Sequence, residues 1–294
     1  MKKLSSMKSV LCVLGAGMLW GCMGILVRTL SAGGFTSLEV TAFRCVVTAI
    51  VMLGILVIRN PKDLKIRMRD LWCFVGTGIC SVTFFNVCYF SCMQYTGLSV
   101  AAILLYTAPS FVMVMSFFLF KEKLGVRKLA ALGLAFVGCV MVSGGLTGEG
   151  IGPAGLLTGL GAGFGYALYS IFGRYAIQRG YSSFTITFYT FLLAGIGTIP
   201  LLNLNHFGAC LLAGEAQLPF AIFMSVLTTV VAYLLYTNGL KGLDNGKASI
   251  IASIEPVMAS VVGLVVYGEA MTTMGVLGMV LVLFSCFLAG KEEK

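Results

Sequence analysis

Charged residues are scarce in this sequence. Asp, Glu, Lys and Arg make up 11% of its 294 residues, whereas soluble domains carry about 25%. There is one histidine, no P-loop motif for nucleotide hydrolysis, and no cysteine pair at metal-ligand spacing. The apolar stretches also lack a cluster of His, Asp and Glu or a serine beside a base. We therefore expect a protein that is not an enzyme and that binds no cofactor and no metal.

Apolar residues dominate what is present. They make up 59% of the chain, and the mean hydropathy is +0.99, which is more than a soluble fold can bury. The net charge of +9 lies in short loops between apolar runs, so it does not indicate binding to nucleic acid. A membrane-spanning helix needs about 20 apolar residues. The sequence predicts an all-α polytopic membrane protein with ten transmembrane helices, at 9–31, 38–58, 71–95, 98–120, 128–146, 154–176, 183–203, 218–240, 248–268 and 272–290.

The positions of Lys and Arg predict the orientation of these spans. With the N-terminus in the cytoplasm, 18 of the 20 basic residues fall in inner loops, as the positive-inside rule requires. The two exceptions are Arg28 and Arg44. The first apolar run continues to Val27 without a cleavage site, so we expect an uncleaved first helix. The prediction is a multi-pass protein of the cytoplasmic (inner) membrane with both termini in the cytoplasm.

The second half of the chain repeats the first at an offset of 146 or 147 residues. The aligned positions are Leu14 to Gly17 with Leu160 to Gly163, Trp20 with Tyr166, Ile25 with Ile171, Arg28 with Arg174, Pro109 with Pro256, and Glu122 with Glu269. Since each half holds five spans, an odd number, the second half must be inverted. Inverted repeats are typical of alternating-access carriers, whose site lies near mid-membrane. We assign residues 1–147 and 148–294 to two inverted five-helix repeats around a central cavity.

Glu255 stands near the middle of the predicted ninth span, directly before Pro256. A charge at mid-bilayer costs about 2.5–3.5 kcal/mol, so such residues usually face a cavity or a partner. Pro256 removes a backbone donor and frees carbonyl groups for water or a ligand; Pro109 is the aligned helix-breaking position in the first repeat. One interpretation is a protonated glutamic acid bonded between helices. We favour the other, an acid that lines a substrate or proton path.

Further candidate residues for a solute site are polar or aromatic and lie inside the spans rather than at the interfaces where aromatic belts gather. They are Trp20, Asn86, Tyr89, Tyr106, Tyr166, Tyr169, Tyr233 and Ser253. Together with Glu255 they describe an aromatic chamber with one acid. Aromatic ring faces attract cations by about 0.5–2 kcal/mol, so the chamber suits an ammonium-bearing solute.

Other polar residues receive structural interpretations. We expect Arg44 to pair with Glu269 or Glu39, or to extend toward the outer surface, rather than to bind substrate. Glu122 and Glu269 are predicted to be packing and capping residues of the repeat. The loop at 203–217 is the longest on the outer side; it holds His206, expected to be simply solvated, and Cys210, a thiol without a disulfide partner.

The chain resembles the EamA family of the drug/metabolite transporter superfamily over essentially its full length. The matching features are the Gly-Ala-Gly-x-x-Trp-Gly segment from Gly15 to Gly21, the pair Phe43-Arg44, and the segments 109–122 and 255–269. The resemblance implies ten helices in two inverted repeats. It also implies secondary transport, often export, of amino acids or similar small metabolites. Spans one, three, four, six, eight and nine would then line the cavity.

We therefore expect a secondary active transporter that moves amino acids or amine-bearing solutes by alternating access, with Trp20, Tyr106 and Tyr166 as the cavity walls. Protons are the candidate coupling ion, a hypothesis that rests on Glu255. The alternative is a lipid or lipid-carrier translocase, which the lack of mid-membrane lysine disfavours. The expected partners are a small-molecule solute and the lipid bilayer, and the sequence leaves open a monomer or a homodimer.

Overall fold

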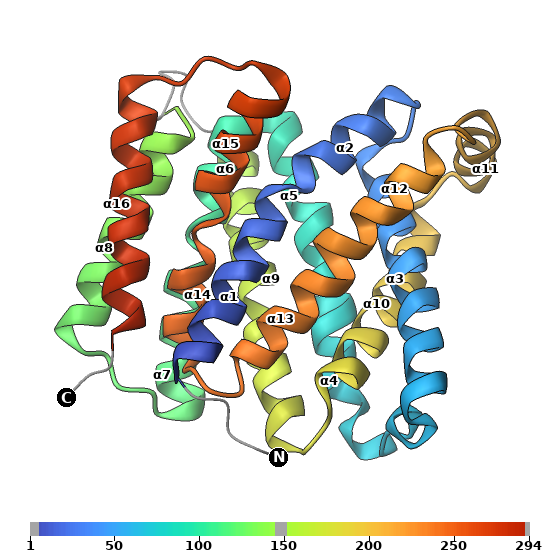
Figure 1. The fold of residues 1–294 in the computed structure, drawn as a ribbon, viewed down its shortest axis with the longest axis horizontal. Helices are drawn as coiled ribbons and strands as arrows, with labels where there is room; N and C mark the ends of the chain where they lie inside the picture. Colours follow the sequence, from blue (N-terminus) through green and yellow to red (C-terminus); the bar gives the residue numbers. More distant parts are fainter. Residues whose placement is uncertain (1–5, 145–151, 292–294) are drawn as a thin grey trace.

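A computed structural model describes residues 6–144 and 152–291, and in these ranges the chain is helical without strands (Figure 1). Within these ranges, nine helical segments are long and apolar enough to cross a membrane. They are Ser6–Ala32, Ser37–Arg59, Met68–Thr96, Leu98–Phe120, Pro153–Gln178, Ser183–Leu201, Leu218–Gly239, Asn245–Tyr267 and Thr273–Gly290.

The tenth predicted span is α8, Val126–Val142. Its 17 residues give a length of about 26 Å, close to the hydrocarbon thickness of about 30 Å. It packs along α16 (Thr273–Gly290) (Figure 1). The ten-helix prediction is therefore confirmed; the last two residues of the predicted span 128–146 lie outside the described ranges.

Several of the spans consist of shorter helices in series. The first span combines α1 (Ser6–Gly21) and α2 (Met23–Ala32), and the second is α3 (Ser37–Arg59). The third contains α4 (Leu71–Val75), the π-helical segment η3 (Gly76–Thr83) and α5 (Phe84–Thr96). The sixth is α9 (Pro153–Gln178) and the seventh begins with α10 (Ser183–Thr198). The eighth joins α12 (Leu218–Ser225), the π-helical η5 (Val226–Val231) and α13 (Ala232–Gly239).

The fourth and ninth spans are broken at aligned positions. The fourth is α6 (Leu98–Leu105) followed by α7 (Ala108–Phe120), and the ninth is α14 (Asn245–Ala252) followed by α15 (Glu255–Tyr267). Pro109 and Pro256 lie in the first turn of the second helix of each pair, where a missing backbone N–H costs nothing. The breaks therefore leave helix ends inside the protein, as in many transporters.

Helices of the two halves interleave rather than form separate blocks. The pairs α8 and α16, α5 and α9, α3 and α10, and α1 and α13 pack against each other. Each pair joins one helix from before residue 145 with one from after residue 152. Reciprocal small residues allow the closest approach: Gly138 and Gly278 meet so tightly that a Cβ on either would lie within 2.8 Å of the other's carbonyl oxygen.

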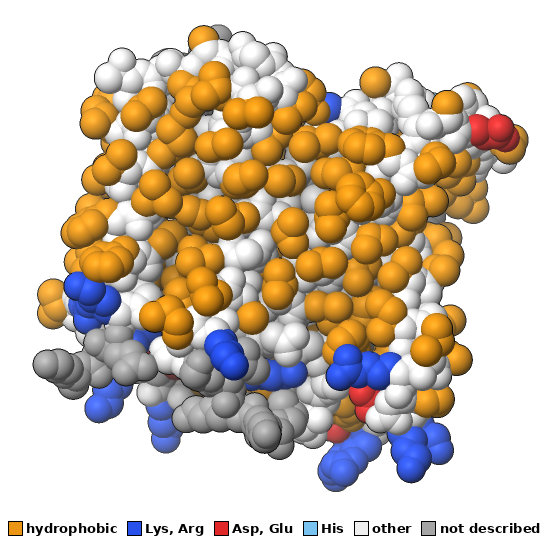
Figure 2. All heavy atoms as spheres, in the orientation of Figure 1, with side chains coloured by type: hydrophobic (Ala, Val, Ile, Leu, Met, Phe, Trp, Pro, Cys, Tyr) orange, Lys and Arg blue, Asp and Glu red, His pale blue; other side chains and the backbone are white. Residues whose placement is uncertain are grey.

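The surface combines apolar sides with one basic end. Figure 2 shows apolar side chains over the sides of the bundle and Lys and Arg along one edge. We call that edge the basic end; it carries the connections after α3, α7, α9 and α13. Large side chains such as Ile58, Leu157 and Val265 are at least 75% exposed on the sides. Such an exposed apolar surface suits contact with lipid tails, so the chain is a multi-pass membrane protein.

The opposite end carries a helix that the sequence did not predict. Residues expected to form the loop 203–217 contain α11, Leu204–Ala213, and Asn203 caps its start by accepting from the His206 backbone N–H at 3.2 Å. We call this end of the molecule the α11 end. Cys210 lies on α11 and is buried rather than in a loop. The expectation of a simply solvated His206 is also wrong, because its ring bonds to Glu39.

Candidate functional site

Glu255 is the first residue of α15 and follows the break at Ser253 and Ile254. Its side chain faces the protein: Tyr166 Oη lies 3.5 Å from Glu255 Oε2, a separation too long for a strong hydrogen bond. Glu255 is partly buried, so the carboxyl group has little contact with water. An incompletely bonded acid at the broken end of a helix is a group that a ligand or an ion can reach.

Tyr166, the neighbour of Glu255, belongs to a cluster of aromatic rings. The Trp20 ring centroid lies 6.0 Å from that of Tyr166, 5.2 Å from Tyr233 and 5.1 Å from Tyr236. Tyr169 and Tyr233 meet edge to face at 4.9 Å. Thus α1, α9 and α13 each contribute to one aromatic cluster. The structure brings together the predicted residues Trp20, Tyr166, Tyr169 and Tyr233.

The cavity at this cluster is almost closed. Its volume is about 10 Å³, roughly the space that one water molecule needs. Its walls are Trp20, Ser81, Val82, Phe85, Tyr166, Tyr169, Ser170, Tyr233 and Tyr236. The Trp20 indole N–H is buried and has no hydrogen-bond acceptor among the described residues. A buried unpaired donor is costly, and functional sites are one place where such groups occur.

Arg44 also reaches this region, contrary to prediction. Its Nε donates to Thr229 Oγ1 at 3.1 Å, and Thr229 lies four residues before Tyr233 of the aromatic cluster. The two carboxylates proposed as its partners are engaged elsewhere: Glu269 bonds to Arg28 and Glu39 to His206. The expected pairing of Arg44 with Glu269 or Glu39 is therefore wrong. The π-helical segment η5 places Thr229 where it accepts from Arg44.

Other predicted residues have bonding partners within the protein. Asn86 donates to Val82 O at 2.7 Å and accepts from Thr41 Oγ1 at 3.1 Å, which fixes it between α3 and α5. Ser253 Oγ donates to Ser249 O in the preceding turn. The Tyr169 hydroxyl lies 2.8 Å from Thr237 Oγ1. These bonds give the three side chains structural roles in the observed conformation.

Tyr89 and Tyr106 lie at the edge of the aromatic cluster. Tyr89 packs on Phe85 at 5.8 Å, and Phe85 in turn meets Tyr166 at 5.5 Å. Tyr106 stands at the α6–α7 break, the position aligned with Ser253, and packs against the apolar cluster that includes Cys139 and Ile254. Tyr89 is therefore linked to the aromatic cluster through Phe85, whereas Tyr106 packs beside the α14–α15 break.

Five of the nine residues that line this cavity were not predicted, among them Tyr236 and Ser170. Tyr236 is 2% exposed and its hydroxyl lies 2.7 Å from Ser170 Oγ. The sequence did indicate Tyr236, because it is three residues after Tyr233 on the same helix and residues at that spacing share a face. Ser170 carried no such signal, since a serine within an apolar helix commonly bonds its own backbone.

A polar network closes the basic end below the cluster. Arg174 Nε donates to Asn245 Oδ1 at 2.9 Å, and its other nitrogens donate to the carbonyl oxygens of Leu240 and Leu243. The backbone N–H of Asn245 donates to Glu122 at 2.8 Å, and that of Gly246 donates to the same carboxylate at 3.2 Å. Glu122 therefore caps the start of α14, which confirms its predicted capping role.

A large cavity opens at the α11 end. Its volume is about 860 Å³, and residues of α3, α5, the connection before α11 and α11 itself form its walls. Its lining includes Glu39, Gln94, Asn203 and His206. The two ends of the bundle therefore differ, with a bonded network at the basic end and a cavity at the other.

The fold and the site together define a class. Two interleaved five-helix halves, with broken helices that place a lone carboxylate among aromatic rings, are characteristic of membrane transport proteins. The chain belongs to the EamA-like transporter family, whose sequence model matches it twice, over residues 7–144 and 153–290.

Individual relatives support the same assignment. A protein of Archaeoglobus fulgidus named "Uncharacterized transporter" is 30% identical over 205 residues, which cover 69% of this chain and 71% of that protein. "Uncharacterized transporter YwfM" of Bacillus subtilis is 24% identical and spans 92% of this chain and 90% of its own. "Uncharacterized inner membrane transporter YicL" of Salmonella typhimurium is 20% identical over 99% of this chain and 97% of its own.

The crystal structure of another protein has the same fold as this chain. It superposes with a TM-score of 0.76 at 17% identity, over 96% of each chain. At this identity the likeness concerns the arrangement of helices.

Proposed function

We propose that this protein is a secondary active transporter that exports an amino acid or a similar amine-bearing solute across the cytoplasmic membrane. The observation that carries the proposal is the position of Glu255 at the α14–α15 break beside Tyr166 of the aromatic cluster, while Arg44 is bonded to Thr229, four residues before Tyr233 of the same cluster. An acid and a base in one region complement the ammonium and carboxylate groups of a zwitterion.

In this proposal, different residues bind different groups of the solute. Glu255 pairs with the ammonium group, and Arg44 binds the carboxylate through guanidinium nitrogens other than the Nε held by Thr229. The faces of Trp20 and Tyr166 attract the same ammonium group by about 0.5–2 kcal/mol. The Trp20 N–H, unpaired in the described part of the chain, gains an acceptor when solute is bound. The nearly closed cavity must widen to admit the solute.

Alternating access supplies that widening. The bonded network at the basic end is what a carrier closed toward the cytoplasm would have. Inward opening would require Arg174 and Glu122 to release Asn245. The repeats 1–147 and 148–294 would rock against each other about the central cluster. In this proposal the basic end and both termini face the cytoplasm, as the positive-inside rule favours.

Transport into vesicles tests the proposal. The purified chain is first screened by thermal shift against the common amino acids and small diamines. Uptake of the solute that stabilises it is then measured in proteoliposomes that contain the protein, with and without a pH gradient. We expect Glu255→Gln and Arg44→Gln each to lower the flux at least about 10-fold, since each loses a charged hydrogen bond to solute of about 1.5–3 kcal/mol.

Matched controls separate the site from general effects. Glu215→Gln and Arg69→Gln make the same chemical changes at exposed positions, and both should transport like the wild type. If Glu255→Gln keeps its dependence on the pH gradient, proton coupling through Glu255 is wrong. If phospholipid scrambling appears while no soluble solute shifts the melting temperature, the chain is a lipid translocase instead.

A further inference from the structure

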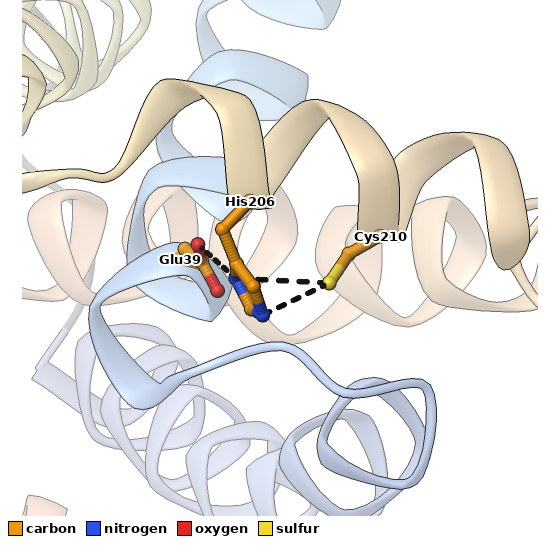
Figure 3. Close-up of side chains that lie close together, drawn as sticks. All are labelled: Glu39, His206 and Cys210. Carbon is orange, nitrogen blue, oxygen red and sulfur yellow. Dashed lines mark hydrogen bonds and ion pairs between the residues drawn. The ribbon is translucent and has the colours of Figure 1, made fainter.

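Three potential metal ligands converge at the α11 end, outside the aromatic cluster. Glu39 comes from the first turn of α3, while His206 and Cys210 are one turn apart on α11. Figure 3 shows the His206 ring between the Glu39 carboxylate and the Cys210 thiol. One ligand atom from each residue can be chosen so that all three lie within 4.8 Å of one another. The spacing along the chain gave no signal, because Glu39 is 167 residues from His206.

The separations are near those of a bound ion. Glu39 Oε1 lies 2.8 Å from His206 Nδ1, and Cys210 Sγ lies 3.8 Å from each ring nitrogen. Around a tetrahedral zinc ion, bond lengths of about 2.0–2.3 Å place N and O ligands about 3.4 Å apart and N and S ligands about 3.6 Å apart. Shifts of about 0.6 Å or less bring these two ligand pairs to the required geometry.

The burial of Glu39 calls for a cation. Its side chain is 2% exposed, and its hydrogen bonds among the described residues go to the Thr36 backbone N–H and to His206. A neutral imidazole leaves the carboxylate charge uncompensated, and buried charges are usually paired or bound to a metal. A divalent cation would supply that compensation in place of the hydrogen bond between His206 Nδ1 and Glu39 Oε1.

The surroundings fit an open site. Glu39 and His206 line the large cavity at the α11 end, so an ion and a water molecule have a path to them. Cys210 is 8% exposed and packs in an apolar cluster with Phe35, Leu26 and Met224. One side of the site is therefore dry and the other reaches solvent. Three protein ligands with a fourth position left for water make up a common zinc arrangement.

We propose that Glu39, His206 and Cys210 bind one zinc-class divalent cation, with water from the cavity as the fourth ligand. The mixed O, N and S ligands favour Zn²⁺ over hard ions such as Mg²⁺ or Ca²⁺. The bound ion joins α11 to the start of α3 at the mouth of the cavity.

Metal binding by the purified full chain tests this site without any transport measurement. After loading with Zn²⁺ and dialysis, we expect one zinc per chain. Loading with Co²⁺ should give the intense thiolate-to-cobalt absorption that only a sulfur ligand produces. Glu39→Gln, His206→Gln and Cys210→Ser should each weaken binding by more than the roughly 10–100-fold that loss of an outer-shell partner costs.

Controls keep the test decisive. Cys80→Ser changes an exposed thiol and Glu215→Gln an exposed acid at the same end, and both should bind metal normally. Glu39→Gln keeps an acceptor for the Thr36 N–H, so the start of α3 remains capped. If Cys210→Ser also fails to fold, Cys210→Ala takes its place. A wild-type chain that keeps no zinc, or a cobalt spectrum unchanged in the Cys210 variant, overturns the proposal and leaves only a hydrogen-bonded Glu39–His206 pair.

Discussion

Arg28 donates to Glu269 across 2.6 Å at the α11 end, and each side chain is about half exposed (50% and 51%). The guanidinium also lies over the Tyr267 ring at 4.1 Å. The aligned residues of the other half, Arg174 and Glu122, meet at Asn245 instead. The inverted repeat therefore places one Arg–Glu combination at each end, and only that at the basic end holds the start of a broken helix.

This difference predicts that substitution of Glu122 and of Glu269 will change the stability of the protein by different amounts. Glu122→Ala leaves the first N–H groups of α14 without their acceptor, and an unsatisfied buried donor costs about 1–3 kcal/mol. Glu269→Ala removes an exposed ion pair worth about 0–1 kcal/mol. We expect a clearly lower melting temperature in detergent for Glu122→Ala and little change for Glu269→Ala. Equal losses would show that the network at the basic end adds no stability.

The C-terminal ends of α7 and α15, just before Glu122 and Glu269, are a second pair of aligned positions that can be compared. Lys121 and Gly268 occupy aligned positions and both adopt left-handed backbone conformations, with φ of 55° and 66°. The N–H of the next residue returns to the carbonyl of Ser116 or Gly263, as in a Schellman motif. A left-handed residue with a Cβ costs about 1–2 kcal/mol.

Lys121→Gly should therefore raise the free energy of unfolding by up to about 1 kcal/mol, whereas Gly268→Ala should lower it by about the same amount. Thermal unfolding of both variants in one detergent measures the two effects. Gly180→Ala, also at a positive φ, shows whether the cost holds at a third helix end. A destabilised Lys121→Gly would mean that the lysine side chain contributes more than its backbone strain costs.

The sequence predicted what the membrane and the repeat dictate. Apolar length located all ten spans, and the offset between halves identified Pro109 and Pro256 at the two breaks. It could not predict which long side chains meet. Arg44 was placed with the wrong partners because an arginine can extend several ångströms toward either a surface or a cavity. The partnership of Glu39 with His206 depends on α11, whose ten residues are too few to span a membrane.

Lys128 and Asp244 form an ion pair of 2.7 Å at the basic end, with the lysine side chain 2% exposed. Burial alone would raise the pKa of Asp244, but the hydrogen bond and charge of Lys128 together with the charge of Lys247 hold that pKa below its ordinary value. A carboxyl group with a lowered pKa stabilises the fold above its unfolded pKa of about 3.9. That contribution is lost as pH falls through the lower pKa of the folded state.

Asp244→Asn should accordingly destabilise the protein at neutral pH, because Lys128 is left buried without its counter-ion. The difference in melting temperature between wild type and variant should shrink as the pH is lowered from 7 toward about 3. Asp63→Asn, at a partly buried position of the same side that forms no ion pair within the described ranges, serves as the control. A difference in melting temperature that stays constant with pH would contradict the assignment of this stability to the Asp244 charge.

Gly21 lets α1 approach the start of α15 closely, and this contact sets the position of Glu255. A Cβ at Gly21 would lie 2.6 Å from the Glu255 carbonyl oxygen and 2.6 Å from Met258 Cβ, whereas a Cβ at Gly24 would meet nothing within 4 Å. Both glycines belong to the first span, so both substitutions to alanine gain helix propensity of about 1 kcal/mol. Gly21→Ala must also push α15 away from α1, and overpacking costs about 1–3 kcal/mol.

We therefore expect Gly21→Ala to unfold at a lower temperature and to lose flux of the solute found in the thermal-shift screen, since Glu255 moves relative to Trp20. Gly24→Ala should match or exceed the wild type in stability and transport normally. The two measurements together distinguish the causes. If Gly21→Ala is destabilised yet transports at the wild-type rate, the α1–α15 contact stabilises the bundle without positioning the carboxylate. In that case the spacing between Glu255 and the aromatic cluster does not govern transport.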